Sequence, residues 1–190
     1  MAKLKLGVIV GSNRRESINR RLAQALVKLG AGGLEAVFIR IDDLPMYNQD
    51  QEQPVPPAVA RFKSEIETSD ALLFVTPEHS RSIPAVLKNA IDWGARPWGK
   101  TSWPGRPAAI IGASGGVIST AIAQLHLRGI LGAQGLHVMG GEAYIQFKPD
   151  TLDADNNVPD ESVRGFLKAF ADKFAAFAGR LAPERKQAAA

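Results

Sequence analysis

Residues 71–93 read ALLFVTPEHSRSIPAVLKNAIDW and contain three kinds of segment in succession. An apolar run ends at Val75, a polar loop lies between Pro77 and Pro84, and a segment with helical periodicity follows. This order predicts a strand, a loop and a helix. Loops at the carboxyl ends of parallel strands are where open α/β sheets bind their ligands. The loop at 77–82 is therefore a candidate binding loop.

A second turn of the same kind lies near the start of the chain. Residues 6–19 read LGVIVGSNRRESIN, which is again an apolar run, a polar loop and the start of a helical pattern. We expect this first loop and the loop at 77–82 to form two walls of one site.

The rest of the chain alternates in the same way. The pattern predicts strands at 4–10, 34–41, 71–75, 108–111 and 136–139, and helices at 19–29, 58–68, 84–95, 120–131 and 161–180. Such alternation predicts a parallel sheet with helices on both faces. The second strand carries Glu35 and Arg40 and reads as an edge. We therefore expect an α/β fold with a flavodoxin-like, doubly wound five-stranded sheet in the order 2-1-3-4-5.

Composition limits the possible functions. A chain of 190 residues with 45% hydrophobic side chains fits one domain, which we place at 1–182, with 183–190 as a frayed tail. No apolar run approaches the roughly 20 residues of a membrane helix, and no signal-peptide core is visible, so we expect a cytoplasmic protein without membrane contact.

The residue types also limit the chemistry and the partners. Without cysteine, any redox function requires a bound cofactor. The basic residues behind the net charge of +4 are dispersed, so no nucleic-acid partner is expected.

The first loop offers groups that suit a terminal phosphate. It lacks the spacing of GxGxxG and of the P-loop, which disfavours both of those phosphate motifs. Instead, hydroxyl, amide and guanidinium groups precede a helix, at Ser12, Asn13, Arg14, Ser17 and Asn19. Capping of the helix by Ser17 or Asn19 explains one of these residues but not the set. For Arg15, Arg20 and Arg21, a solvated helix face is an equally good interpretation.

The loop at 77–82 and the glycine-containing segment at 113–116 would contact the remainder of such a ligand. A flat ring between loops of this kind can be recognised by backbone N–H groups. A flavin fits, because its redox chemistry belongs to the cofactor and needs no acid or base from the protein. The sequence shows no Ser-His-Asp or paired-carboxylate constellation and no metal-ligand spacing, which agrees with this interpretation.

Two motifs carry a resemblance to a known family. They are Gly11-Ser12-x-Arg14-x-x-Ser17-x-Asn19 and Pro77-Glu78-x-x-x-Ser82-x-Pro84-x-x-Leu87-Lys88-Asn89-Ala90-Ile91-Asp92-Trp93. They closely resemble the NADPH-dependent FMN reductase family, including its quinone and chromate reductase branch, and the resemblance runs from about Lys3 to Phe147. It implies a flavodoxin-like fold, noncovalent FMN and NADPH or NADH as co-substrate. It also implies two-electron transfer to a small-molecule acceptor such as a quinone, free flavin, nitro or azo compound or chromate, and a homodimer or homotetramer. We further expect a ping-pong mechanism, because one domain of this size leaves one open face of the ring for both substrates.

The resemblance also assigns residues by position. It implies that the FMN phosphate is held by Ser12, Arg14, Ser17, Ile18 and Asn19. It implies that the isoalloxazine is lined by Pro77, Glu78, His79, Ser80, Arg81 and Ser82, and that its far side is closed by Ser114, Gly115 and Gly116. Many members read Pro-Glu-Tyr-Asn where this chain has Pro77-Glu78-His79-Ser80, so the acceptor preference stays open.

Two further expectations accompany the resemblance. The indoles of Trp93, Trp98 and Trp103 provide apolar area beyond the second motif, which favours a subunit contact. The main alternative function is a flavodoxin-type electron carrier that does not oxidise NAD(P)H. Such carriers tend to be acidic, whereas this chain is basic.

Overall fold

The computed structural model describes residues 3–30 and 34–188, with the side chains of the last helix as far as residue 182. Its main sheet is parallel, in the order β2-β1-β3-β4-β5. The strands are β1 (Leu4–Val10), β2 (Leu34–Ile39), β3 (Ala71–Val75), β4 (Pro107–Ser114) and β5 (His137–Val138). The predicted flavodoxin-like order is confirmed, and β2 is the edge strand on the side of β1.

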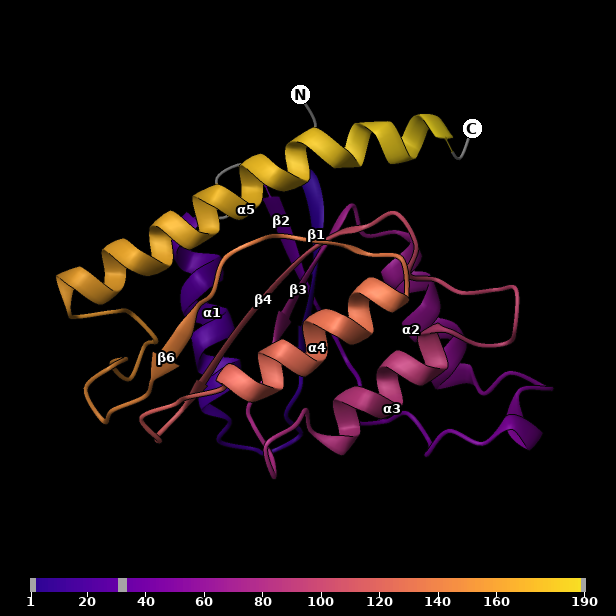
Figure 1. The fold of residues 1–190 in the computed structure, drawn as a ribbon, viewed down its shortest axis with the longest axis horizontal. Coiled ribbons are helices and arrows are strands. Elements are labelled where there is room, and N and C mark those ends of the chain that lie inside the picture. Colours follow the sequence, from indigo (N-terminus) through magenta and orange to yellow (C-terminus); the bar gives the residue numbers. More distant parts are fainter. Residues whose placement is uncertain (1–2, 31–33, 189–190) are drawn as a thin grey trace.

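Helices cover both faces of the sheet (Figure 1). On one face lie α1 (Ile18–Gly30) and α5 (Glu161–Ala188), and on the other α2 (Pro57–Glu67), α3 (Ala85–Gly94) and α4 (Ala121–Ala133), with a short 3-10 helix at Gln49–Gln51. Each face of the sheet has its own hydrophobic core, and alternate residues of β1 point into one or the other. Val8 packs with α1 on one face, and Ile9 packs with α2 and α3 on the other. In the described ranges, no helix has the length and apolar character to cross a membrane.

The last part of the sheet differs from the prediction. Instead of one strand at 136–139, β5 pairs with the start of β4, and a further strand, β6 (Tyr144–Gln146), pairs with the carboxyl end of β4. Between them Gly141 has a φ of 104°, a conformation that favours glycine and breaks the extended run. The helix α5 also continues to Ala188, into the segment that the sequence predicts as a tail.

The three tryptophans do not form one exposed surface. Trp93 and Trp103 are buried in the core, where the Trp103 indole Nε1 donates to the Ile91 carbonyl at 3.0 Å. Only Trp98 among the three is exposed, at 88%. The expectation of a shared apolar surface was therefore wrong for Trp93 and Trp103, because α3 and the segment that follows it fold back onto the sheet.

A close backbone approach at Gly112 brings three elements together beneath the loops. A Cβ on Gly112 would lie 2.1 Å from the Thr76 carbonyl oxygen and 2.5 Å from the Thr120 Oγ1. Thr76 follows β3 and Thr120 precedes α4. The absence of a side chain at Gly112 is thus required for the end of β3 and the start of α4 to meet against β4.

We expect Gly112→Ala to lower the free energy of unfolding by at least about 3 kcal/mol, because the clash is with backbone that cannot rotate away. The matched control is Gly129→Ala in α4, where an added Cβ meets nothing within 4 Å. That change should raise the free energy of unfolding by about 0.5–1 kcal/mol. Urea unfolding of both variants measures the difference, and equal effects would contradict the close approach.

Candidate functional site

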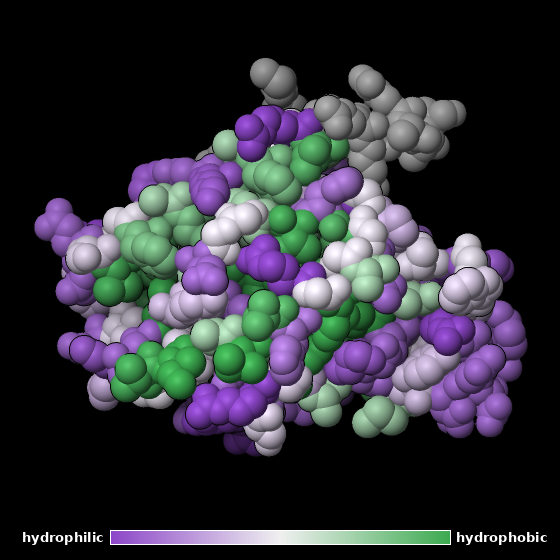
Figure 2. Space-filling view, viewed as in Figure 1, coloured by the Kyte–Doolittle hydropathy of each residue, from purple (hydrophilic) through white to green (hydrophobic). Residues whose placement is uncertain are grey.

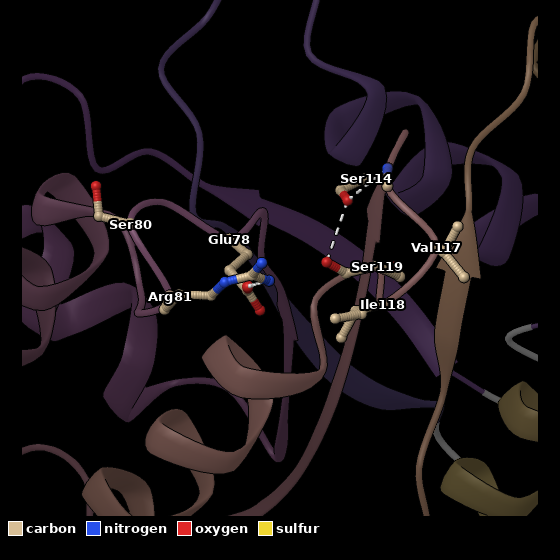
Figure 3. A pocket seen from close by; sticks show the side chains of 8 residues that line it. Glu78, Ser80, Arg81, Ser114, Val117, Ile118 and Ser119 are labelled. Atoms are coloured by element: carbon tan, nitrogen blue, oxygen red, sulfur yellow. Dashed lines mark hydrogen bonds and ion pairs between the residues drawn. The ribbon is translucent and has the colours of Figure 1, made fainter.

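A cavity of about 470 Å³ lies between loop 3, the segment 77–82, and loop 4, the segment 114–119. Loop 3 contributes Glu78, Ser80 and Arg81, and Figure 3 shows them across from the loop 4 side chains. The loop 4 residues that line the cavity are Ser114, Gly116, Val117, Ile118 and Ser119. The structure thus brings together predicted residues of both loops. Val117, Ile118 and Ser119 are additions that the sequence analysis missed.

Loop 3 is a tight two-residue hairpin. The His79 N–H donates to the Ser82 carbonyl at 3.0 Å, and the Ser82 N–H donates back to His79 at 2.9 Å. Ser80 and Arg81 have φ values of 49° and 63°, as a type I′ turn requires. Positive φ at residues other than glycine persists only where the surroundings impose it. Within the described chain, the N–H groups of Ser80 and Arg81 have no acceptor, so they are free to bind a ligand.

The Glu78 carboxylate links loop 3 to α4. Its Oε2 accepts hydrogen bonds from the N–H groups of Ile122 and Ala123, both at 3.0 Å, in the first turn of α4. Its Oε1 accepts from Arg81 Nη1 at 3.1 Å (Figure 3), and the side chain is 7% exposed. The helix has no side-chain cap of its own at Thr120 and no acid in its first turn. Glu78 therefore supplies the cap that α4 lacks.

Loop 4 has a hydrogen-bonded shape of its own. Ser114 Oγ accepts from the Gly116 N–H at 3.2 Å and donates to the Ser119 carbonyl at 3.1 Å. Ser119 Oγ donates to the Ile145 carbonyl of β6 at 2.7 Å, so the unpredicted strand supports this loop. Between these anchors Val117 is 87% exposed and Ile118 is half exposed. Two apolar side chains thus border the mouth of the cavity.

Loop 1 is the segment 11–17 between β1 and α1. The side chains of Ser17 in this loop and of Asn19 in the first turn of α1 have internal partners. Ser17 Oγ accepts from the Arg20 N–H at 3.2 Å, which confirms that Ser17 caps α1. The buried Asn19 amide donates to the Ala113 carbonyl and accepts from the Ala113 N–H, both at 2.9 Å. This pair holds the start of α1 against the end of β4, next to loop 4.

Groups in loop 1 and at the start of α1 remain available for an anion. The N–H groups of Ile18 and Asn19 have no acceptor among the described residues, and neither has the Arg14 guanidinium. A helix start with free N–H groups and an unpaired arginine suits a phosphate. Ser12, Asn13 and Arg14 line a separate cavity on the side of β2 and not the one between loops 3 and 4.

The side chains around the cavity do not form a nucleophilic catalytic unit. Ser82 Oγ lies 3.1 Å from His126 Nδ1, which is a hydroxyl–imidazole contact. In the part of the chain that the structure describes, no carboxylate hydrogen bonds to that imidazole, so the third member of a triad is missing. The cavity instead combines polar side chains, two apolar side chains of loop 4 and free backbone N–H groups, which suits the binding of a reactive cofactor.

Comparison with known proteins identifies relatives that match most of the chain. The family model described as NADPH-dependent FMN reductase matches residues 4–150. A 2-hydroxy-1,4-benzoquinone reductase from a Burkholderia species is 46% identical over 92% of this chain and 96% of its own length. A quinone reductase from Pseudomonas putida is 45% identical over 90% of this chain and 93% of its own. The solved structure of FerB, a flavoenzyme NAD(P)H:(acceptor) oxidoreductase from Paracoccus denitrificans, matches with a TM-score of 0.91 at 45% identity, covering 94% of this chain and 98% of that one.

We expect Glu78→Ala to lower the free energy of unfolding by about 1–3 kcal/mol, because two N–H groups at the start of α4 lose their acceptor. Arg81→Ala is the control, since it removes the exposed end of the same ion pair and leaves the cap intact; it should change stability by no more than about 0.5 kcal/mol. Urea unfolding and hydrogen exchange at the Ile122 and Ala123 amides report the two effects. Equal losses in both variants would show that the cap is not what Glu78 contributes.

Proposed function

Since the chain belongs to the NADPH-dependent FMN reductase family, we propose that it passes electrons from NAD(P)H through FMN to quinones and similar small-molecule acceptors. As a member of that family it is a flavin-dependent oxidoreductase that uses NAD(P)H. The observation that carries the proposal is the cavity between loops 3 and 4, beside a helix start with free N–H groups. FMN needs both features, one for its ring and one for its phosphate.

The residues present fit FMN. Ser12, Arg14 and Ser17 would hold the phosphate, together with the N–H groups of Ile18 and Asn19. The Asn19 side-chain amide would not take part, because it is already bonded to Ala113. The ring would be held between the segment 77–82 and Ser114, Gly115 and Gly116, with the N–H groups of the loops as donors. When bound, FMN supplies the redox chemistry by accepting a hydride and releasing two electrons to the acceptor. The protein's own part is to position the reactants.

Loop 4 bears on the choice of acceptor. Val117 and Ile118 present apolar surface at the cavity mouth, which favours a planar, weakly charged acceptor such as a quinone. Two relatives at 46% and 45% identity are named as quinone reductases. Free flavins and nitro or azo compounds share that planar character. An anion such as chromate would instead depend on Arg81, the guanidinium at the same mouth.

We also propose that the protein is a homodimer or homotetramer. Val117, Ile118 and Leu125 are large apolar side chains exposed on loop 4 and α4. Figure 2 shows apolar surface on the face that α4 occupies in Figure 1. A contact between subunits would cover this area and place the cavity close to the boundary. A cytoplasmic location stays a prediction from the sequence.

Replacing Arg14 by Ala should weaken FMN binding by about 1.5–3 kcal/mol, the range for a hydrogen bond to a charged group. Arg15→Ala removes the same charge one residue further along and should have a much smaller effect. Titration of the apoprotein with FMN, followed by flavin fluorescence, measures both. If the two variants bind FMN equally well, Arg14 belongs to a solvated basic surface and does not hold the phosphate.

Initial rates should follow a ping-pong pattern, because loops 1, 3 and 4 leave one face of the ring for both NAD(P)H and the acceptor. The experiment varies NADPH at several fixed concentrations of a neutral quinone, and parallel double-reciprocal lines are expected. Intersecting lines would show that both substrates bind at once and would contradict a single shared face. Chromate, a nitroaromatic and free FMN tested in the same assay define the acceptor range.

Leu125→Asp should shift the protein towards the monomer, because a charge within an apolar contact is not solvated. Sedimentation velocity at micromolar concentration reads the mass of the parent and the variant. Glu161→Gln, an exposed change at the start of α5, is the control. A parent that sediments as a monomer of 20.4 kDa would contradict the proposed assembly.

A further inference from the structure

A second cavity, of about 500 Å³, lies on the other side of loop 1, at the carboxyl ends of β1 and β2. We call it the arginine groove. Its apolar lining includes Val8, Val10 and Phe38, the last being half buried on the edge strand. Its charged lining consists of Arg14, Arg15, Arg20, Arg40 and one acid, Asp42. The groove thus joins an apolar wall to a strongly positive rim.

Three of these arginines are free to bind an external anion. Arg40 is already paired, since its Nε donates to Asp42 Oδ1 at 2.8 Å. Among the described residues, by contrast, the guanidinium groups of Arg14, Arg15 and Arg20 have neither a hydrogen bond nor an ion pair. Arg128, unlike these three, is engaged with the Met139 and Gly141 carbonyls.

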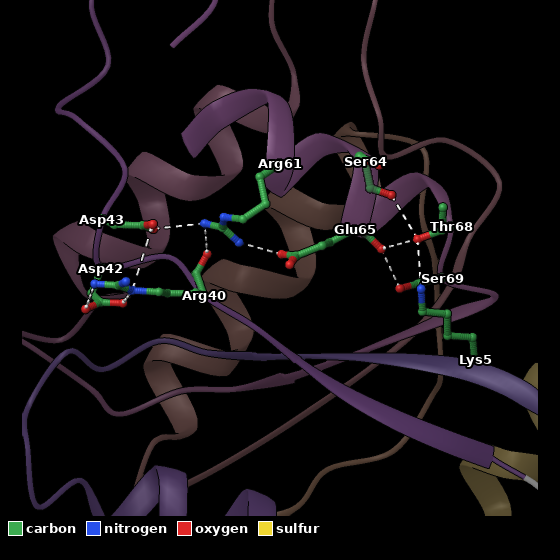
Figure 4. A network of polar contacts seen from close by, with 9 residues as sticks. All are labelled: Lys5, Arg40, Asp42, Asp43, Arg61, Ser64, Glu65, Thr68 and Ser69. Atoms are coloured by element: carbon green, nitrogen blue, oxygen red, sulfur yellow. Dashed lines mark hydrogen bonds and ion pairs between the residues drawn. The ribbon is translucent and has the colours of Figure 1, made fainter. Parts of the chain in front are cut away.

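The outer wall of the groove is held without using these free arginines. Arg61 of α2 donates to the Arg40 carbonyl at 3.0 Å and pairs with Asp43 at 2.9 Å (Figure 4). The hydrogen bond from Arg40 keeps the pKa of Asp42 below its usual value, so that carboxylate stays ionised and offsets the Arg40 charge. The Arg20 charge also helps to lower the pKa of Asp42, so this one acid offsets Arg40 and part of the Arg20 charge. Arg14 and Arg15 have no acid partner among the described residues.

One phosphate does not account for this charge. In the proposed function, the FMN phosphate uses Arg14 and the start of α1, which leaves Arg15 and Arg20 without a ligand. NADPH brings a further phosphate monoester, on the 2′ position of its adenosine ribose, which NADH lacks. Dinucleotide-binding α/β folds read that ribose beside the first loop of the sheet, with an acid for NAD and an arginine for NADP. The arginine groove resembles that site only in its position in the fold. Its arginines without a hydrogen bond support a phosphate site independently of this likeness.

We propose that the arginine groove binds the adenosine end of NADPH, with Arg15 and Arg20 on the 2′-phosphate and the apolar wall at Phe38 beside the adenine. This inference rests on the proposed function and adds to it the choice between the two co-substrates. A guanidinium pair matches a phosphate monoester in shape and charge. Loss of either arginine therefore affects NADPH and leaves NADH unaffected.

The test compares kcat/KM for NADPH and for NADH, with the same quinone, in the parent holoenzyme and in Arg15→Ala and Arg20→Ala. Each variant should lower the value for NADPH by about tenfold, as loss of one charge-assisted hydrogen bond does, and the NADH value should stay within about twofold. Arg180→Ala, which removes an exposed arginine of α5, is the control of equal charge and should change neither value.

Calorimetry gives a measurement that does not depend on turnover. Adenosine 2′,5′-bisphosphate should bind the parent holoenzyme more tightly than adenosine 5′-monophosphate, and Arg20→Ala should abolish that difference. Equal losses of kcat/KM for NADPH and for NADH in the variants would overturn the proposal. It would also be overturned if the variants lost activity only when free FMN replaced the quinone as acceptor, because the groove would then bind the phosphate of the acceptor. Failure of the proposed function looks different, because the parent would then oxidise neither co-substrate.

Discussion

The pair of hydrogen bonds between the Asn19 amide and the Ala113 backbone is the interaction on which the rest of the site depends. It joins the first turn of α1 to the end of β4 across 94 residues of sequence. Because the amide is buried and both of its groups are satisfied, the contact has one geometry. The free N–H groups of α1 and the backbone of loop 4 therefore keep a fixed relation before any ligand arrives.

Glu78 has a comparable role on the other side of the cavity. Its carboxylate ties loop 3 to the first turn of α4, while the hairpin at His79 and Ser82 fixes the shape of the loop. The walls are thus set by internal hydrogen bonds, which lowers the entropic cost of binding a rigid ring. A protein that binds a redox cofactor needs such positioning more than it needs an acid or base. The backbone donors and apolar side chains at the site agree with that division of roles.

The sequence predicted the features that depend on local pattern. Alternation of apolar and helical segments predicted a doubly wound sheet, whose commonest strand order is the one observed. Capping of α1 was open between Ser17 and Asn19, and the structure selects Ser17. It did not predict β6, because three residues are too few to show a period. The partners of Glu78 lie 44 and 45 residues away, beyond the reach of any local rule. Likewise, Arg20 and Arg40 share a groove only because β1 and β2 pair with Val8 opposite Phe38.

The central claim is that the cavity holds FMN which NAD(P)H can reduce and a quinone can reoxidise. Anaerobic mixing of the purified holoprotein with NADPH, followed by rapid absorbance measurement, tests it most directly. The flavin absorbance should bleach rapidly and return in full when a quinone is added. A protein that carries no flavin, or whose flavin stays oxidised with both NADPH and NADH, would contradict the claim and indicate a binding module or an electron carrier.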